Sequence, residues 1–384
     1  MTPTIGAAKP IRLCFALTSP VRGGVEEVVL ALLRRLDPAE FRLAMAAPGP
    51  LLDAFAADLA GVHVDTVAVT AESWTAPRPL ATLARFFRRW RPDIVNPHLF
   101  RSTVVAAPLA RLAGVPGVVE TYHGREGWRQ GRMPGAFLVD RTIARVVDRV
   151  IAVSKAAGRF LVEGKGYPAD RVVVVPNGRD LTAFAPADHR EAVRKELGLD
   201  DGVPLIGVVG RLETQKGHGY LLDAWPAILR EFPDARLVVI GDGSLRSDLE
   251  RQAHRLGIAA SIAFLGFRTD MPRLLDGLDG LALPSLYEGM PLTVIEASAM
   301  ACPVVATAVD GTPEVIDDDV TGWLVPPADP PALARAIVRL LRDPDRARAI
   351  GRAGRARVLR QFDLGRQVEA TARVYRSVVD RERS

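Results

Sequence analysis

The sequence alternates short apolar runs with stretches of helical periodicity, and this alternation constrains the fold more than any other feature. Runs of strand length that alternate with helices are typical of a parallel sheet covered by helices on both faces. The first half of the chain therefore predicts a doubly wound, Rossmann-like α/β sheet. Its expected strands lie at residues 11–17, 43–47, 62–67, 94–95, 117–121, 150–153 and 172–175.

The same alternation starts again beyond residue 183 and predicts a second sheet of the same kind. We expect two domains, residues 1–182 and 183–362, with a C-terminal helix at 363–384 that can pack back on the first domain. The 384 residues, 48% of them hydrophobic, are ample for two cores. Ligands of such sheets bind beyond the carboxyl ends of the strands, so we expect the two domains to face each other across a cleft. The strands of the second sheet are expected at residues 205–209, 237–240, 262–265, 281–283, 304–306 and 323–325.

Composition and charge narrow the functional classes. No apolar run is long enough for a membrane span and no signal peptide is visible, so we expect a cytoplasmic protein. Cys14 and Cys302 stand in separate strand-like runs, which favours buried thiols over a disulfide or a thiolate metal site. Residues 1–180 carry 24 Lys and Arg against 16 Asp and Glu, so this half has a charge of +8 within a net charge of +5. Such a surplus attracts nucleic acid, anionic membrane or a small anion, and no nucleic-acid-binding module is visible.

Two cations follow the first expected strand of the second domain. Arg211 comes just after the run at 205–209, and Lys216 follows five residues later. Gly217 and Gly219 let the backbone turn into a helix whose first N–H groups point back at the end of the strand. Cations beside a helix N-terminus form an anion site, and a guanidinium with an ammonium suits a diphosphate. The alternative is a solvated loop with two surface cations.

The stretch "YEGMPLTVIEAS" places Glu288 and Glu296 eight positions apart, around a Gly-Met-Pro that cannot lie inside a helix. Pro291 fits the first turn of a helix, so Glu288 should lie in the preceding loop and Glu296 about a turn and a half inside the helix. The N–H groups of residues 290–293 can donate to sugar hydroxyls or phosphate, and Glu296 can accept from both hydroxyls of a ribose. The alternatives are that Glu288 only decorates a turn and that Glu296 pairs with a structural arginine or with backbone amides.

The first domain supplies further candidates where its strands end. Gly23 and Gly24 follow the first strand and allow backbone N–H groups to come close to a phosphate or an incoming acceptor. His123 ends a strand and is therefore expected to point into the cleft, and His98 also ends a strand. Either histidine can instead be structural, and His98 can cap a turn.

These segments together resemble the retaining glycosyltransferases of family 4, which have the GT-B fold and move a sugar from a nucleotide-sugar donor to an acceptor hydroxyl. The Glu-x7-Glu signature of that family is matched by "EGMPLTVIE". Around it stand "GRLETQKG", "VVIGDGSLRSDL", "FLGFRTDM", "PVVATAVDGTPEVI" and "TGWLVPPADP" in the family's usual order. In the first half, "SPVRGGVEEVV", "YHG", "VIAVSKAAGRFL" and "VVVVPNGRD" extend the resemblance over nearly the whole chain.

The resemblance implies a role for each matched residue. Arg211 and Lys216 would hold the donor diphosphate, and Glu296 would hold the ribose. Glu288 would bind the transferred sugar, and His123 would touch that sugar and its phosphate, so that Arg211, Lys216, Glu288 and His123 are the predicted catalytic groups. The base would be held largely through the main chain of the turn that ends at Phe267 and Arg268. The further predicted donor contacts are Gly23, Gly24, Gly289, Met290, Pro291, Leu292 and Thr293.

Neither a metal nor another cofactor is expected. A retaining glycosidase needs two carboxylates roughly 5 Å apart, and no motif supplies that pair. In similar transferases the departing diphosphate helps take the acceptor proton while the protein stabilises its charge. The acidic triplet 317–319 lies in an expected turn, so we do not read it as a metal site. Asp310 and Ala301 stand where glycine is common in the family, and Asp310 can narrow the approach to the donor phosphates.

The acceptor is the least determined substrate. Residues 79–90 have apolar side chains at helical spacing and arginines elsewhere on the wheel, which favours a core-packed helix over membrane docking. The Gly- and Arg-rich loop after His123 contains Arg125 and Trp128, which we predict as acceptor contacts together with His98. We expect an acceptor hydroxyl that can be lipid-linked, peripheral contact with the anionic inner face of a membrane, and a UDP-hexose or UDP-N-acetylhexosamine donor.

Three alternatives remain open from the sequence. A nucleotide-sugar 2-epimerase of the same fold needs no second substrate, so incubation with donor alone separates it from a transferase. A catalytically inactive sugar-nucleotide-binding protein would keep Arg211, Lys216 and Glu296 but show no turnover. A nicotinamide-dependent dehydrogenase is disfavoured because "SPVRGGVE" lacks the G-x-G-x-x-G pattern.

Overall fold

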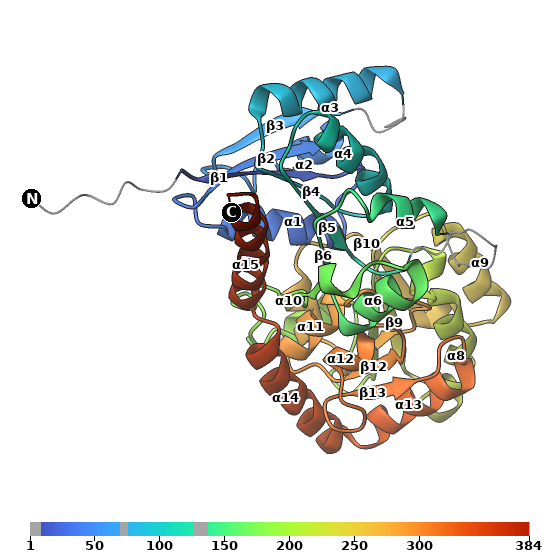
Figure 1. Ribbon diagram of the computed structural model, residues 1–384. Coiled ribbons are helices and arrows are strands. Elements are labelled where there is room, and N and C mark those ends of the chain that lie inside the picture. The colour runs from blue at the N-terminus through green and yellow to red at the C-terminus, as the bar shows by residue number, and fades with distance from the viewer. Residues whose placement is uncertain (1–8, 70–75, 126–136, 384) are drawn as a thin grey trace, which may run out of the picture. The chain divides into compact units, whose positions relative to one another are not determined.

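The computed structural model describes residues 9–69, 76–125 and 137–383, and the chain forms two compact units (Figure 1). The first unit comprises residues 1–177 and 365–384, and the second comprises residues 178–364. The boundary thus falls five residues before the expected position of 182. Arg179 explains the difference, because its N–H donates to the carbonyl of Phe362 and its side chain pairs with Glu296, both within the second unit.

The first unit is built on a seven-stranded parallel sheet in the order β3-β2-β1-β4-β5-β6-β7. Every strand expected from the sequence is present. Most side chains of β1, β2, β4, β5 and β6 are buried, whereas the edge strands β3 and β7 have only partly buried or exposed side chains. The strands are β1 Ile11–Ala16, β2 Phe41–Ala47, β3 Val64–Ala68, β4 Ile94–Pro97, β5 Gly117–Tyr122, β6 Arg149–Ala152 and β7 Val172–Val174.

Helices connect these strands, and a helix that follows the second unit completes the first. The helix α3 buries Leu83, Phe87 and Trp90 and exposes Arg88 and Arg89, so it is the core-packed helix that its periodicity predicts. The helices are α1 Gly24–Arg35, α2 Gly49–Phe55, α3 Pro77–Trp90, α4 Phe100–Leu112, α5 Leu138–Ile143, α6 Lys155–Arg159 with a π-helical turn Phe160–Lys165, and α15 Leu364–Arg383.

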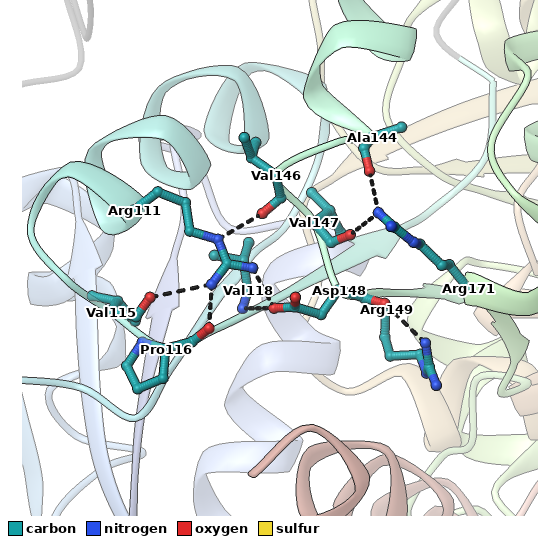
Figure 2. Close-up of polar contacts among 10 residues, drawn as sticks. All are labelled: Arg111, Val115, Pro116, Val118, Ala144, Val146, Val147, Asp148, Arg149 and Arg171. Carbon is teal, nitrogen blue, oxygen red and sulfur yellow. Dashed lines mark hydrogen bonds and ion pairs between the residues drawn. The ribbon is translucent and has the colours of Figure 1, made fainter. Parts of the chain in front are cut away.

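Some arginines of the first unit form hydrogen bonds and ion pairs between loops at the amino ends of β5 and β6. Arg111, near the end of α4, donates to the carbonyls of Val146 and Val115 and lies 2.6 Å from Asp148 (Figure 2). Asp148 also accepts from the N–H of Val118 at 2.7 Å. These arginine contacts satisfy backbone carbonyls where helices return to the sheet, so the +8 charge does not by itself indicate an anionic ligand.

The second unit has a six-stranded parallel sheet in the order β10-β9-β8-β11-β12-β13. The strand order reverses beside β8, whose neighbours are β9 and β11. Such a reversal point is where ligands bind in open α/β sheets. The strands are β8 Leu205–Val209, β9 Arg236–Ile240, β10 Ile262–Gly266, β11 Gly280–Leu283, β12 Val304–Thr307 and β13 Trp323–Val325.

The helices of the second unit pack on this sheet around a core that includes the fully buried Trp225, whose indole N–H donates to Ser261 at 2.9 Å. The two Rossmann-like sheets confirm the predicted fold class. Among the described residues, no helix is both long enough and apolar enough to cross a bilayer. The helices are α7 Arg190–Glu196, α8 His218–Glu231, α9 Arg246–Arg255, α10 Met271–Asp276, α11 Leu292–Ala299, α12 Thr312–Val315, α13 Pro330–Arg342 and α14 Pro344–Gln361.

Candidate active site

The loops that follow β8 and β11 lie against each other at the carboxyl edge of the second unit's sheet. The carbonyl of Gln215 accepts from the N–H of Leu286 at 2.8 Å, and its side chain donates to the carbonyl of Tyr287 at 3.0 Å. Gly217 has a φ of 65°, and a Cβ on it would lie 2.1 Å from the carbonyl oxygen of Pro284. Glycine is therefore required at this point, because the two loops touch backbone to backbone.

This loop pairing brings two of the predicted catalytic residues together. Lys216 Nζ lies 2.6 Å from Glu288 Oε1, and the Ser285 hydroxyl donates to the same oxygen at 2.7 Å. Glu288 is buried, so its carboxylate is held by an ammonium and a hydroxyl away from bulk water. Lys216 and Glu288 were each predicted from the sequence, but neither their ion pair nor the role of Ser285 was.

Asp310 holds the same loop from the neighbouring strand connection. Its Oδ2 accepts from the N–H of Glu288 at 3.0 Å. Its φ of 41° is in the left-handed region, which glycine adopts more readily than aspartate. In this chain Asp310 gives up the backbone freedom of glycine but provides a carboxylate that accepts from the N–H of Glu288 and so fixes the loop.

Arg211 differs from Lys216 in its environment. Its side chain is exposed just beyond the end of β8 and makes no hydrogen bond or ion pair with other residues in the described ranges. Next to Lys216, α8 begins at His218, and its first N–H groups carry the partial positive charge of a helix N-terminus. An anion placed here can therefore be bound by a guanidinium and by helix amides.

The helix after Glu288 starts one residue later than predicted. Pro291 is the residue directly before α11 rather than part of its first turn, and Leu292 and Thr293 are the first helical residues. Gly289 and Met290 lie in the preceding loop. Glu296 Oε1 lies 2.7 Å from Arg179 Nε, so the structure contains the pairing with an arginine that the sequence left open as an alternative to ribose binding.

The turn after β10 presents Phe267, which is 69% exposed. Arg268 does not point into open space, because it makes two hydrogen bonds with Asp270, at 2.8 and 2.7 Å, and one with Glu196 at 3.0 Å. These contacts lower the pKa of Asp270 to about 2, with the Arg268 guanidinium as the main cause. The side chain of Arg268 therefore braces the turn, which leaves its main chain and Phe267 as the surface that a ligand can meet.

In the first unit, His98 and His123 form one hydrogen-bonded pair. Nδ1 of His98 lies 2.8 Å from Nε2 of His123, and Nε2 of His98 lies 3.0 Å from Asn96 Oδ1. His98 is fully buried and His123 half-buried, so His98 can influence a ligand only through His123. Burial lowers the pKa of His98 well below its usual value and that of His123 to about 3, so both rings are neutral at pH 7.

Two residues of this cluster were not predicted from the sequence. Asn96 lies in β4, and His98 follows the end of that strand two positions later, where it continues the extended pairing with a bridge to Thr121. Residues two apart in an extended segment lie on the same face, so this spacing could have indicated their contact. The hydroxyl of Tyr375 on α15 donates to Asn96 Oδ1 at 2.7 Å. The two residues are 279 positions apart, so no local sequence pattern predicts that contact.

The other predicted contacts of the first unit occupy different places. Gly23 is the residue before α1, Gly24 begins it, and both follow the end of β1. The Arg125 guanidinium lies over the ring of Phe160, 4.8 Å from its centre. Trp128 lies outside the described residues, so its predicted acceptor contact has no position in the structure.

Within residues 9–69, 76–125 and 137–383, no group of three or more His, Cys, Asp or Glu side chains is arranged so that it could hold a metal ion. The acidic triplet is accounted for by protein contacts. Asp319 lies 2.9 Å from Arg339 and 2.8 Å from Arg346, and Asp318 accepts from the N–H of Leu324 at 2.9 Å. Cys14 and Cys302 are both buried and unpaired by any disulfide, as predicted.

Comparison with known proteins finds glycosyltransferases over nearly the whole chain. An Escherichia coli enzyme named UDP-Gal:alpha-D-GlcNAc-diphosphoundecaprenol alpha-1,3-galactosyltransferase is 27% identical over 379 residues, which cover 96% of this chain and 97% of that enzyme. Alpha-maltose-1-phosphate synthase of Mycolicibacterium smegmatis is 33% identical over 312 residues, covering 74% of this chain and 79% of that enzyme. The crystal structure of Anabaena HepE in complex with UDP and glucose shares the fold, with a TM-score of 0.84 at 22% identity over 96% of this chain and 100% of that one.

The fold, the cationic strand end and these relatives define a class: the protein is a glycosyltransferase of the GT-B type that uses a nucleotide sugar. Two family models give the particular family. The glycosyltransferase family 4 model matches residues 22–183, and the model of group 1 glycosyl transferases matches residues 189–357. The chain belongs to glycosyltransferase family 4, which confirms the resemblance found in the sequence and does not favour the epimerase or the inactive binding protein.

Proposed function

We propose that the protein is a retaining, metal-independent glycosyltransferase that moves a hexose or N-acetylhexosamine from a UDP-linked donor to an acceptor hydroxyl. The observation that carries the proposal is the arrangement of Arg211, Lys216 and the start of α8 at the strand-order reversal beside β8. A diphosphate is the ligand whose charge and oxygen count suit that arrangement. The UDP-galactose named for the E. coli relative supports a UDP-linked donor.

The proposed chemistry is a substitution at the anomeric carbon of the donor sugar. The bond between that carbon and the diphosphate oxygen breaks, and a bond to the acceptor oxygen forms on the same face of the sugar. The acceptor proton passes to an oxygen of the leaving diphosphate, so the protein does not need to supply a general base. The task of the protein is then to stabilise the negative charge that grows on the diphosphate, which preorganised cations and helix N–H groups do in place.

The state of the two glutamates supports this electrostatic mechanism over a double displacement on a carboxylate. Glu288 is ion-paired with Lys216, and Glu296 is ion-paired with Arg179. A carboxylate held by a cation is a weaker nucleophile than one that faces the substrate alone, because attack must first break the pair. Glu288 is instead suited to accept hydrogen bonds from sugar hydroxyls and to fix the Lys216 ammonium.

Metal independence gives a direct prediction. We expect turnover to persist after dialysis against EDTA, because the charge on the leaving group is met by Arg211, Lys216 and the amides of α8. The measurement is the initial rate of UDP release from UDP-glucose or UDP-galactose with acceptor, before and after chelation. Loss of activity on chelation and its return with Mg²⁺ or Mn²⁺ would contradict the proposed mechanism.

The donor nucleotide gives a second prediction. UDP should raise the melting temperature of the protein more than GDP or ADP, since a ligand at 100 times its Kd adds about 2.7 kcal/mol to stability. A thermal-shift panel of the three free diphosphates at equal concentration measures this. An exposed aromatic, Phe267, and a main-chain turn meet the base in this proposal, so the discrimination is expected to be graded rather than absolute. A clear shift with GDP and none with UDP would exclude the UDP donor.

For the acceptor, we propose a hydroxyl of a lipid-linked sugar, and the diphosphoundecaprenol acceptor named for the E. coli relative supports it. The exposed arginines of α3, Arg85, Arg88 and Arg89, add a cationic face that suits an anionic membrane surface. We expect co-sedimentation with vesicles that contain anionic lipid at low salt and release at high salt. Equal recovery with neutral vesicles, or no binding at low salt, would favour a water-soluble acceptor.

A further inference from the structure

A chain of four side chains in the first unit ends at His123. Tyr375 lies 2.7 Å from Asn96 Oδ1, the same oxygen lies 3.0 Å from His98 Nε2, and His98 Nδ1 lies 2.8 Å from His123 Nε2. Tyr375, Asn96 and His98 are fully buried, so none of them can exchange its partner for bulk water. The direction of every hydrogen bond in the chain can therefore be worked out from one group whose role is fixed.

That group is the backbone carbonyl of Val119 on β5, which can only accept. The amide nitrogen of Asn96 donates to it and also lies 3.0 Å from the Thr121 hydroxyl. If the amide were reversed, its oxygen would face the Val119 carbonyl, and two acceptors would be in contact in a buried site. The orientation of Asn96 is thus set, and its Oδ1 faces Tyr375 and His98 as an acceptor.

The protonation of His98 follows from that orientation. Because Asn96 Oδ1 cannot donate, Nε2 of His98 carries the proton. The ring is neutral, since its nitrogens face Asn96 and His123 rather than a carboxylate, and burial lowers its pKa well below the usual value. A neutral imidazole has one bare nitrogen, so Nδ1 of His98 is an acceptor, and the proton shared with His123 belongs to Nε2 of His123.

We propose that Asn96 and His98 act as positioning residues that hold His123 in the tautomer protonated at Nε2, so that its Nδ1 presents a hydrogen-bond acceptor to a hydroxyl of the substrate sugar. This inference rests on the proposed function, because it deepens the role of His123 in binding a sugar. Neutral His123 with Nε2 already donating to His98 has no N–H left. It therefore repels the oxygens of a phosphate or a carboxylate, which only accept, and favours a neutral hydroxyl.

The inference narrows the role that the family resemblance gave to His123. Contact with both the sugar and its phosphate would need a ring N–H or a positive charge for the phosphate. The hydrogen bond to His98 uses the single N–H of the neutral His123 ring, and burial lowers the pKa of His123 to about 3. His123 therefore has no ring N–H and no positive charge left for a phosphate. In this chain the phosphate must then be met by other groups, and His123 selects for a hydroxyl-bearing sugar over one with an anionic group at the same place.

The tautomer can be measured without any turnover. The chain has six histidines, so ¹⁵N-histidine labelling with long-range ¹H–¹⁵N correlation gives a tractable spectrum of ring nitrogens. The His123 signals are assigned by their loss in His123→Gln. We expect the pattern of a neutral ring protonated at Nε2 and bare at Nδ1 at pH 7. A charged His123, or one protonated at Nδ1, would overturn the proposal.

Two variants at position 98 distinguish an effect of the His98 hydrogen bonds on the His123 tautomer from an effect of side-chain packing alone. Glutamine can donate to Asn96 with its amide nitrogen and accept from His123 with its oxygen, so His98→Gln should preserve the His123 tautomer. Leucine fills the space but accepts nothing, so in His98→Leu the tautomer should be lost or mixed. His63→Leu, at an exposed histidine of the same unit, is the matched control and should leave the His123 signals unchanged. Identical His123 spectra in wild type and His98→Leu would contradict the proposal that His98 sets the tautomer of His123.

If His98→Leu fails to fold, Tyr375→Phe keeps the test open. That variant removes one of the two donors to Asn96 Oδ1 while preserving the ring, and we expect the His123 tautomer to persist because His98 still donates to that oxygen. Reversal of the His123 tautomer in Tyr375→Phe would show that the hydrogen-bond directions derived above are wrong.

Ligand titration then tests the sugar contact itself. UDP-glucose should move the bare Nδ1 signal of His123 to lower frequency, as expected when it accepts a hydrogen bond, and UDP alone should not. A shift with UDP would indicate phosphate contact and overturn the assignment. Calorimetric failure to bind UDP, UDP-glucose and UDP-galactose would contradict the proposed function, whereas the tautomer measured in the free protein would stand or fall separately. We expect kcat/KM with the UDP-sugar to fall about tenfold in His98→Leu, the equivalent of one hydrogen bond, and to be largely retained in His98→Gln.

Discussion

Replacing Lys216 or Arg211 with alanine will lower kcat/KM by about two to three orders of magnitude, comparable to the loss of one preorganised donor from an oxyanion-binding site. In the proposed mechanism each residue places a positive charge where the leaving diphosphate gains negative charge. Arg211 is exposed and makes no ion pair with the other described residues, so its charge is available for the substrate. The measurement is steady-state kinetics on variants whose circular dichroism and melting curves show that they are folded.

Matched controls make this result specific. Lys195→Ala on α7 and Arg230→Ala near the end of α8 remove the same charges from exposed positions in the second unit. They should change kcat/KM by less than about threefold, as surface substitutions usually have small effects. A loss below about tenfold in both Lys216→Ala and Arg211→Ala would remove these residues from the diphosphate site.

The Lys216 variant also needs a correction for folding, because it leaves Glu288 buried without its ammonium. We expect Lys216→Ala to lower the melting temperature, since an uncompensated buried charge destabilises the folded state. Adding Glu288→Gln should restore part of the stability, because the buried group is then neutral, yet it should restore no activity. Recovery of activity in the double variant would show that the effect of Lys216 was structural rather than electrostatic.

Gly217→Ala should abolish binding of UDP and lower stability by more than the usual conformational penalty. A side chain at a left-handed residue costs about 1–2 kcal/mol. At Gly217 the added Cβ would also lie 2.1 Å from the carbonyl oxygen of Pro284, a distance that forces the loops after β8 and β11 apart. Separation of those loops displaces Lys216 from Glu288, which stand on opposite sides of the contact.

Gly198→Ala is the matched control for this variant. Its φ of 67° is close to the 65° of Gly217, and no atom lies within 4 Å of the place that its added Cβ would take, so it measures the backbone penalty alone. Denaturant unfolding gives the free energy of both variants, and calorimetry with UDP gives their binding. Equal loss of stability with normal UDP binding in Gly217→Ala would mean that the loop contact has no role in the site.

The fold could be predicted from the sequence because it depends on local patterns. Each of the expected runs is a strand, and most of them are buried apolar segments that can be recognised without knowing their neighbours in the sheet. The helix α3 was equally accessible, because its apolar stripe buries Leu83, Phe87 and Trp90. The position of Pro291 was misjudged by one residue, because the residue before a helix and the first residue within it favour the same φ.

The pairings within the site could not be predicted in the same way. Lys216 and Glu288 are 72 positions apart and meet because β8 and β11 are adjacent in the sheet, an order that periodicity does not reveal. The pairing of Glu296 with Arg179 was foreseen only as one of two readings, since a carboxylate inside a helix suits both a cation and a ribose. Side-chain identity indicated which groups were important, and only the three-dimensional arrangement showed which of them already have partners.

The return of the chain to the first unit after residue 364 has a consequence for biosynthesis. The second unit is a continuous segment, 178–364, so all of its strands are synthesised one after another without an intervening part of the first unit. The first unit needs Tyr375, which is synthesised after the whole second unit, to complete the hydrogen bonds of Asn96. During translation the second unit can therefore fold before the first unit is complete, and a chain that stops before Tyr375 lacks part of the unit whose synthesis began first.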